Sequence, residues 1–248
     1  MKKVFQNKYI SFEKEIDQLI ASYNEKGEQL KDARNKLKIF DLKDFKVNIK
    51  SFKVPNSINQ IVYRFFRKGK AQRSFEYANK LLSLGIGTPS PIAYYESKTL
   101  FFFKKSFYVS EQIEYDLTFR ELSNDINYPD HEKLLRAFTR FTFKLHQKGI
   151  HFLDHSPGNT LINITPNGYN FYLVDLNRMQ FEPMPFKKGV RNFNRLSKYP
   201  EIVKIMSDEY AKCVNKDPVE VYTLMWQYTN EFRTKIRRKN RLKNKLKK

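Results

Sequence analysis

The sequence of 248 residues contains a single cysteine, Cys213, so neither an internal disulfide nor a cysteine-based zinc site can form within one chain. No apolar run approaches the ~18–20 residues needed to cross a bilayer, and the first residues lack the apolar stretch of a secretory signal peptide. Acidic residues are also few, with 26 Asp and Glu against 47 Lys and Arg, a formal net charge of +21. These absences predict a soluble protein of a reducing compartment with an anionic partner, such as nucleic acid, a membrane face or a phosphorylated small molecule.

The excess positive charge is uneven along the chain. Residues 232–248 hold ten Lys and Arg and no acid, which leaves a net charge of +11 for the remainder. Three interpretations of this basic tail are open: a solvated helix end, a segment that binds nucleic-acid phosphates, and a contact with an anionic membrane leaflet. Each Lys or Arg at such a leaflet contributes about 1 kcal/mol, so even half of the ten would be enough to localise the chain.

Hydrophobic periodicity divides the chain into a strand-rich front half and a mainly helical back half. Apolar residues recur at helical spacing near 16–23, 70–84, 130–149 and from 218 onward. Alternating runs predict strands at 37–41, 45–52, 92–95, 100–103 and 107–113. Asn167-Gly168 between two further alternating runs indicates a β-hairpin in the back half.

Some details of these helices follow from single residues. Gly27 is expected to end the first helix. Asp130 and Asp217 are expected to N-cap the last two helices. The buried face of the helix at 70–84 is expected to consist of four residues: Ala71, Phe75, Ala78 and Leu82.

The most informative stretch follows the long helix at 130–149. Asp154 and Asn159 lie five residues apart, and Asp175 ends the second strand of the predicted hairpin. Phosphoryl transfer needs an acid that accepts a hydroxyl proton, together with amide and carboxylate oxygens that hold Mg²⁺. The pattern therefore predicts Asp154 as the catalytic base and Asn159 and Asp175 as metal ligands.

This series of residues resembles the catalytic core of the protein-kinase-like superfamily. D-x-x-x-x-N from Asp154 to Asn159, a hairpin and then Asp175 follow one another, and V-N-I-K ending at Lys50 is similar to the V-A-I-K of kinases. Glu76 lies in the next helix, where helix C of kinases carries its acid. The resemblance implies that Lys50 binds ATP phosphates and that Glu76 holds Lys50 in place.

One branch of the superfamily is resembled most closely, the bacterial lipopolysaccharide core kinases of the Kdo kinase family. The resemblance covers about residues 27–200 and rests on five motifs: K-S-F-K from Lys50, K-A-x-R-S-x-E-Y-A from Lys70, G-I-G-T-P-S-P from Gly85, D-H-S-P-G-N from Asp154 and D-L-N-R-M from Asp175. It implies an α+β, bilobal, protein-kinase-like fold. The expected parts are an antiparallel-sheet N-lobe with one inserted helix at 1–113, a mainly helical C-lobe with the catalytic loop and metal-binding hairpin at 114–231, and the basic tail at 232–248.

The resemblance also implies a reaction and a location. The γ-phosphoryl of ATP, with Mg²⁺, is expected to move to a sugar hydroxyl, of Kdo or another inner-core sugar, on a lipid A-linked saccharide. We expect the enzyme to be cytoplasmic and peripheral on the inner membrane, with the tail at 232–248 on its anionic surface. Nucleic acid stays the less favoured partner, and the sequence does not define an oligomeric state.

Several positions depart from the kinase pattern. Phe152 stands where ordinary kinases have a histidine two residues before the catalytic Asp, and Asn177 replaces the glycine of D-F-G. No G-x-G-x-x-G precedes Lys50, so the loop that covers the ATP phosphates must differ from the usual glycine-rich one. No A-P-E follows Asp175, and Pro183 and Pro185 break the chain soon afterwards, which argues against a peptide-binding segment. Two alternatives stay open: an atypical Ser/Thr protein kinase associated with ribosomes or RNA, and a catalytically inactive kinase-like scaffold that binds membrane.

Each candidate residue also has an ordinary structural interpretation. Lys50 could be a solvated strand lysine, Glu76 part of an exposed helix face, and Asp154 the cap of a local turn. Asn159 and Asp175 taken singly would be a turn residue and a strand-end cap. Their joint occurrence around a hairpin favours the functional interpretation.

A zinc site is a further alternative at the catalytic loop. His146, His151 and His155 are spaced four to five residues apart. The last spacing runs into a Pro-Gly turn, and no H-E-x-x-H is present. The metal-ligand interpretation of these histidines is therefore disfavoured.

Overall fold

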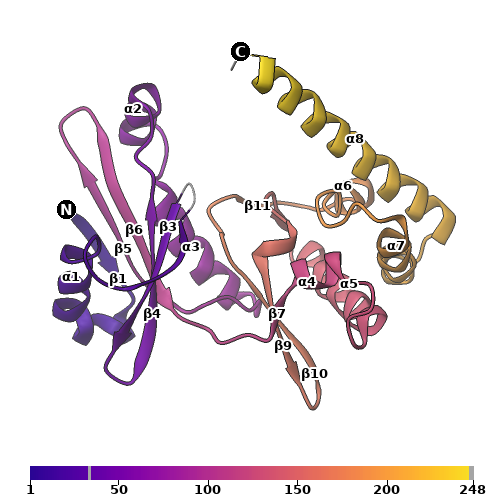
Figure 1. The fold of residues 1–248 in the computed structure, drawn as a ribbon, viewed down its shortest axis with the longest axis horizontal. Coiled ribbons are helices and arrows are strands. Elements are labelled where there is room, and N and C mark those ends of the chain that lie inside the picture. Colours follow the sequence, from indigo (N-terminus) through magenta and orange to yellow (C-terminus); the bar gives the residue numbers. More distant parts are fainter. Residues whose placement is uncertain (33–34, 246–248) are drawn as a thin grey trace. The chain divides into compact units, whose positions relative to one another are not determined.

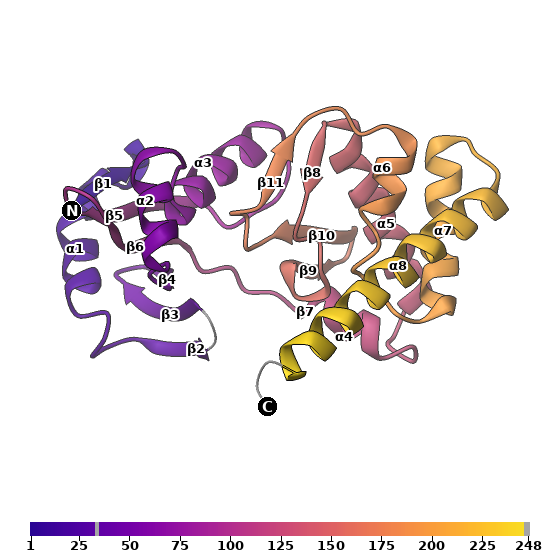
Figure 2. The same ribbon diagram turned by 90° about the horizontal axis from the view of Figure 1, so that it is seen from above.

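The structure is a computed structural model that describes residues 1–32 and 35–245. It divides into two compact units, shown in Figures 1 and 2. Unit 1 comprises residues 1–114 and the short segment 175–177, and unit 2 comprises residues 115–174 and 178–248. The chain therefore contributes Asp175 to unit 1 although that residue follows a hairpin of unit 2.

Unit 1 is built on one antiparallel sheet of six strands, in the order β1-β5-β6-β4-β3-β2. Its helical elements are η1, a 3₁₀ turn, and the α-helices α1, α2 and α3. In chain order the elements are β1 (Lys2–Phe5), η1 (Asn7–Phe12), α1 (Glu13–Ala21), β2 (Glu28–Asp32), β3 (Asn35–Leu42), β4 (Phe45–Phe52), α2 (Ser57–Phe65), α3 (Lys70–Ser83), β5 (Pro91–Lys98) and β6 (Phe103–Glu111).

The side-chain alternation of β4 sends two kinds of residue to the two faces of this sheet. Val47 and Ile49 are fully buried in a cluster that also contains Ile16 and Ile20 of α1. Phe52 packs on the opposite face, in a cluster with residues of α3. Lys50 shares the face of Phe52, with its Nζ 5.5 Å from the Phe52 ring centroid. The hydrophobic pattern of one strand thus places Lys50 on the α3 side of the sheet.

Unit 1 differs from the sequence prediction in several elements. The predicted hairpin of strands at 37–41 and 45–52 is confirmed as β3 and β4. The predicted strand at 100–103 is wrong, because Thr99 and Phe102 close a turn in which the Thr99 amide donates to the Phe102 carbonyl at 2.8 Å. Strands β1 and β2 and helix α2 were not predicted, and the first helix ends at Ala21, before Gly27.

Helix α3 confirms the predicted face except at one position. Ala71, Phe75 and Ala78 are buried, but Leu82 is exposed and Leu81 is fully buried in its place. The spacing from Ala78 to Leu81 is three residues, which keeps Leu81 on the same helix face as Ala71 and Ala78.

Unit 2 is mainly helical and carries two small sheets, one of order β10-β9-β7 and one pairing β11 with β8. Its remaining regular elements are a 3₁₀ turn, η2, and five α-helices. In chain order the elements are β7 (Leu117–Thr118), α4 (Phe119–Asn124), α5 (His131–Gln147), β8 (Ile150–Phe152), η2 (Pro157–Asn159), β9 (Thr160–Thr165), β10 (Gly168–Leu173), β11 (Met179–Phe181), α6 (Phe186–Arg191), α7 (Pro200–Val214) and α8 (Pro218–Lys245).

The long helix α5 organises the core of unit 2. Leu134, Phe138 and Leu145 form a stripe of fully buried residues on this helix, and Phe141 packs against the same cluster. The helix begins after Asp130 as predicted, but Asp130 has φ 54 and makes no side-chain capping bond. Asp130 therefore occupies the predicted N-cap position but does not cap the helix with its side chain.

The two predicted features on either side of α6 and α7 are confirmed. Strands β9 and β10 form the predicted hairpin, with Gly168 paired to Thr165. Asp217 caps α8 by accepting from the Glu220 amide at 2.9 Å.

Helix α8 continues through the expected start of the basic tail at residue 232 and ends at Lys245. No helix within residues 1–32 and 35–245 is both long and apolar enough to span a membrane.

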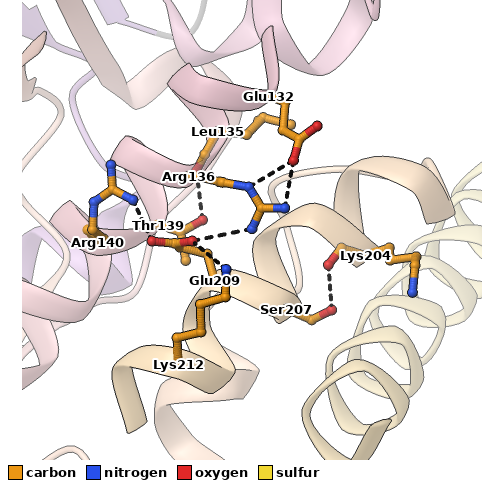
Figure 3. A network of polar contacts seen from close by, with 9 residues as sticks. All are labelled: Glu132, Leu135, Arg136, Thr139, Arg140, Lys204, Ser207, Glu209 and Lys212. Carbon is orange, nitrogen blue, oxygen red and sulfur yellow. Dashed lines mark hydrogen bonds and ion pairs between the residues drawn. The ribbon is translucent and has the colours of Figure 1, made fainter. Parts of the chain in front are cut away.

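A buried carboxylate joins α5 to α7 in unit 2. Glu209, of which 9% of the side chain is exposed, accepts from Arg136 and from Arg140 (Figure 3). Burial opposes ionisation of Glu209, but the hydrogen bonds from Arg140 and Arg136 outweigh it and lower the pKa of the carboxyl group. Arg136 also binds Glu132, whose side chain is 61% exposed.

We expect Glu209→Ala to lower the free energy of unfolding by about 1–3 kcal/mol, because two guanidinium groups lose a charged acceptor. Glu132→Ala, which removes an exposed carboxylate from the same Arg136, serves as the control and is expected to cost about 0.5 kcal/mol. Urea unfolding of the three proteins checks this. Equal losses for the two variants would show that burial of Glu209 adds nothing.

Candidate active site

Lys50 and Asp175 are brought together in unit 1. The Lys50 Nζ donates to the Asp175 Oδ1 at 2.5 Å, across 125 positions of sequence. Both side chains are partly buried, so the charged pair retains some access to solvent. Asp175 has φ 60, a left-handed conformation that a non-glycine residue adopts only when its surroundings hold it there. The ion pair with Lys50 is one contact that does so.

Asn177 is a second partner of the Asp175 carboxylate. Its Nδ2 donates to the Asp175 Oδ1 at 2.7 Å, and the Asn177 side chain is buried. The asparagine that replaces the glycine of D-F-G therefore orients the preceding aspartate. A glycine at this position would offer no side-chain donor.

Asp154 lies in unit 2, in the loop between β8 and η2. The Arg195 Nη1 contacts the Asp154 Oδ1 at 2.5 Å and also donates to the carbonyl of Leu153 at 2.9 Å. Arg178 approaches the other carboxylate oxygen at 3.7 Å. The Asp154 side chain is 17% exposed, so it is oriented by two guanidinium groups and still reachable from solvent.

Asn159 holds the same loop from its other end. Its Nδ2 donates to the Asp154 carbonyl at 2.8 Å, and its own carbonyl accepts from the Val174 amide at 3.0 Å. Asp154, Asn159 and the end of β10 are thus linked through main-chain groups of unit 2. Because the amide nitrogen of Asn159 is committed to Asp154, its amide oxygen is the atom available to a cation.

Buried aromatic residues pack against the loop that carries Asp154. Phe152 is fully buried, and its carbonyl accepts from the Asn192 Nδ2 at 2.9 Å. His155 is also fully buried, stacked on the Phe138 ring at 5.4 Å between centroids, with its Nε2 3.2 Å from the Thr142 hydroxyl. The phenylalanine that replaces the usual histidine therefore belongs to the core beneath Asp154.

Glu76 does not take the place that the kinase pattern predicts. Its carboxylate pairs with Lys68 at 2.8 Å and accepts from Gln72 at 2.9 Å. Within the described residues no ion pair joins Glu76 to Lys50, whose partner is Asp175. Lys68 lies just before the start of α3, and its side chain extends forward along the helix to Glu76. The expected Lys50–Glu76 pair is corrected accordingly.

The three histidines considered as a zinc site have different polar partners, and the His151 Nδ1 lies 3.5 Å from the Glu182 carboxylate. His146 contacts the Tyr210 hydroxyl at 2.9 Å and Asn192 at 3.2 Å, whereas His155 contacts Thr142. Across residues 1–32 and 35–245, no three His, Cys, Asp or Glu side chains gather as a metal site. His146, His151 and His155 therefore do not come together as a metal-binding group within the described residues.

The chemistry of the remaining polar groups fits magnesium and a nucleotide. Asp175 of unit 1 presents a partly exposed carboxylate, and Asn159 of unit 2 presents an amide oxygen; each taken by itself is an oxygen ligand of the kind that Mg²⁺ prefers. The ammonium group of Lys50 is bound to the Asp175 carboxylate. Phosphate oxygens of a nucleotide could take the place of that carboxylate as the partner of Lys50.

Sequence reasoning missed two residues of this region. Arg195 lies between α6 and α7, and nothing in the local sequence distinguishes it from the other Lys and Arg residues of the chain. Asn177 was noticed only as a departure from D-F-G, although an asparagine two residues after an aspartate is a signal for a local hydrogen bond. Both act on an aspartate that the motif did identify.

The two units together have the element composition of a protein-kinase-like fold. The model of the lipopolysaccharide kinase (Kdo/WaaP) family matches residues 41–216. The chain belongs to this family, as the sequence resemblance indicated. Comparison with curated proteins finds no match to the sequence.

Three solved structures are similar to this chain to different degrees. A structure described as WaaP in complex with acyl carrier protein matches with a TM-score of 0.64 at 14% identity, over 93% of this chain and 99% of that chain. A MAP kinase, LmaMPK10 of Leishmania major, matches at 0.45 and 17% identity, over 80% of this chain and 60% of that one. The PknI kinase domain of Mycobacterium tuberculosis, as a double mutant, matches at 0.42 and 12%, over 77% and 74%. The first of these supports the predicted α+β kinase-like fold.

The buried histidines of unit 2 make stability depend on pH. Burial lowers the pKa of His155 to about 3 and that of His146 to about 4 from an ordinary value of 6.5. In the unfolded chain each of these histidines therefore takes up a proton near pH 6.5, whereas in the folded chain it stays neutral at that pH. The stabilising contribution is complete above pH 6.5 and is lost as the pH falls toward 3.

We expect His155→Phe to reduce the slope of unfolding free energy against pH between pH 6.5 and 4, whatever its stability at pH 7. Denaturant unfolding at a series of pH values measures that slope. An unchanged slope in the variant would mean that His155 takes up its proton equally well in both states.

Proposed function

We propose that this chain transfers the γ-phosphoryl group of ATP to a sugar hydroxyl, of Kdo or another inner-core sugar, on a lipid A-linked saccharide. The observation that carries the proposal is the contact between Lys50 and Asp175, in a chain of the lipopolysaccharide kinase family. A strand lysine and the aspartate after a hairpin are the two groups that kinases use for nucleotide phosphates and metal.

The roles follow from the chemistry of each side chain. Lys50 would bind the phosphates of ATP, and Asp175 and Asn159 would supply oxygen ligands to Mg²⁺, which neutralises charge on the phosphates when bound. Asp154 would orient the acceptor hydroxyl and take its proton.

The surroundings of Asp154 favour an acidic acceptor over a peptide. Arg178 and Arg195 place two guanidinium groups beside the proposed base, and Arg178 is more than half exposed. Arg groups suit carboxylate or phosphate recognition. After Asp175 the chain forms only the short strand β11 before α6 begins at Phe186, which leaves little length for a peptide-binding segment.

We propose further that the exposed basic part of α8, from residue 232, contacts the anionic surface of the inner membrane. Eight Lys and Arg residues lie between Arg233 and Lys245, and no acid interrupts them. Each would add about 1 kcal/mol at an anionic leaflet. This placement would keep a cytoplasmic enzyme next to a lipid-linked acceptor.

Asp154→Ala is expected to lower turnover by roughly 10²–10⁴-fold while ATP binding persists, because the general base acts in the transition state and not on the nucleotide. The protein is incubated with ATP, Mg²⁺ and Kdo-lipid A, and mass spectrometry records the addition of one phosphate. Asp44→Ala, in the exposed turn between β3 and β4, is the control and should match the wild-type rate.

Unchanged turnover in the Asp154→Ala protein would remove Asp154 from the reaction. Phosphorylation of a protein but of no saccharide would instead favour a protein kinase. Absence of any Mg²⁺-dependent ATP turnover in the wild-type protein would favour a catalytically inactive scaffold.

A further inference from the structure

One end of unit 1 carries an apolar surface that the proposed reaction does not use. It combines α2 and the residue after it with the turn that joins β5 to β6. Phe66 is 82% exposed and Leu100 is 71% exposed, although both are large apolar side chains. We call the set the apolar end surface, and its members are Ile58, Ile61, Phe65, Phe66, Leu100, Phe101 and Phe102.

In helix α2 the exposed apolar residues recur at helical spacing. Asn56 caps the helix by accepting from the Asn59 amide at 3.1 Å. Ile58, Ile61 and Phe65 follow at spacings of three and four residues, which places them on one helix face. That face is exposed, so the amphipathic helix turns apolar residues toward solvent. A water-soluble helix normally buries such a face against its own protein.

Contacts on the opposite side of α2 hold it beside the β5–β6 turn. The Arg64 Nε donates to the Thr99 carbonyl at 3.1 Å, and the Tyr63 ring lies 5.9 Å from that of Phe103. Figure 1 shows α2 and the tip of the hairpin at the same end of the sheet. The two apolar segments, more than thirty residues apart in sequence, therefore form one surface.

The charge around this surface has one sign. Residues 53–75 contain six Lys and Arg and no acid, and residues 97–110 contain three Lys and no acid. The neighbouring acids are already engaged: Glu76 pairs with Lys68, and Glu96, which is buried, pairs with Lys98. Two of the exposed rings have a cation against them: the Arg64 guanidinium lies 5.2 Å from the Phe65 ring centroid, and the Lys104 Nζ lies 5.2 Å from that of Phe102.

We propose that the apolar end surface inserts into the interface of an anionic lipid bilayer. Apolar side chains there enter the acyl boundary while Lys and Arg meet anionic headgroups, which is the combination that interfacial helices use. A second copy of this chain would bring another cationic rim against the first, so self-association is opposed by charge. Nucleic acid would satisfy the cations but leave the phenylalanine and leucine side chains in water.

This contact differs from the one proposed for α8, which is cationic and has few apolar side chains. It does not depend on the kinase reaction, because none of its residues is assigned a part in it. An inserted surface would resist salt, since burial of apolar area is not screened, whereas adsorption of α8 would weaken as salt rises.

The test uses the full chain and vesicles of phosphatidylethanolamine with phosphatidylglycerol, compared with vesicles of phosphatidylcholine. Phe65→Ser with Phe66→Ser, and Leu100→Ser with Phe101→Ser, each remove two exposed side chains. Ile126→Ser with Ile164→Ser removes two exposed apolar side chains of unit 2 and is the matched control. We expect each of the first two pairs to lower the partition coefficient at least about tenfold in co-sedimentation, and the control pair to leave it unchanged.

A spectroscopic measurement separates insertion from adsorption. A Phe66→Trp protein that also carries Trp226→Phe reports from the surface alone, and its emission should shift to the blue on vesicle binding and be quenched by brominated acyl chains. No blue shift on bound vesicles, or equal losses in the unit 2 control pair, would overturn the proposal. Concentration-dependent dimers that the Phe65/Phe66 variant abolishes, without vesicle binding, would assign the surface to a second copy and overturn it as well.

Discussion

The ion pair between Lys50 and Asp175 is the interaction on which the functional account depends. It ties the central strand β4 of the unit 1 sheet to a residue 125 positions later in sequence, at a cost in backbone strain at Asp175. The strand can present Lys50 only because Val47 and Ile49 fill the other face of the sheet. The burial pattern of one strand and the left-handed turn of one aspartate therefore determine how Lys50 and Asp175 meet in unit 1.

The loop of unit 2 that carries Asp154 is also held in place by buried residues. The neighbours of Asp154 fix the conformation of its loop. Phe152 and His155 are buried in the core, and Asn192 donates to the Phe152 carbonyl. Arg195 then orients the carboxylate from outside the loop. The aromatic layer that gives the loop its shape requires His155 to stay neutral, so local order at Asp154 and sensitivity to acid have the same origin.

Much of this was predictable from the sequence, for physical reasons that differ by element. Strands β3 and β4, the β9–β10 hairpin and the buried stripe of α5 follow from periodicity and turn residues. Asp154, Asn159 and Asp175 were chosen for the chemistry of phosphoryl transfer, and Lys50 was chosen from the resemblance to kinase motifs. Long-range partners could not be predicted this way: Arg195 reaches Asp154 only through the packing of unit 2. Glu76 was assigned to Lys50 because spacing does not reveal that Lys68 lies closer. The run 100–103 was predicted as a strand because it is apolar and apolar runs are normally buried. In the structure most of its side chains are exposed.

The most direct test of the central claim is calorimetric titration of ATP, with and without Mg²⁺, into the wild-type protein and into its Lys50→Met and Asp175→Asn variants. We predict that Lys50→Met weakens ATP binding about tenfold in both conditions, the loss expected for a charged hydrogen bond. Asp175→Asn should remove most of the enhancement by Mg²⁺ and leave metal-free binding intact or tighter, because Lys50 loses its competing partner. Binding of ATP with Mg²⁺ to both variants as tightly as to the wild type would contradict the account.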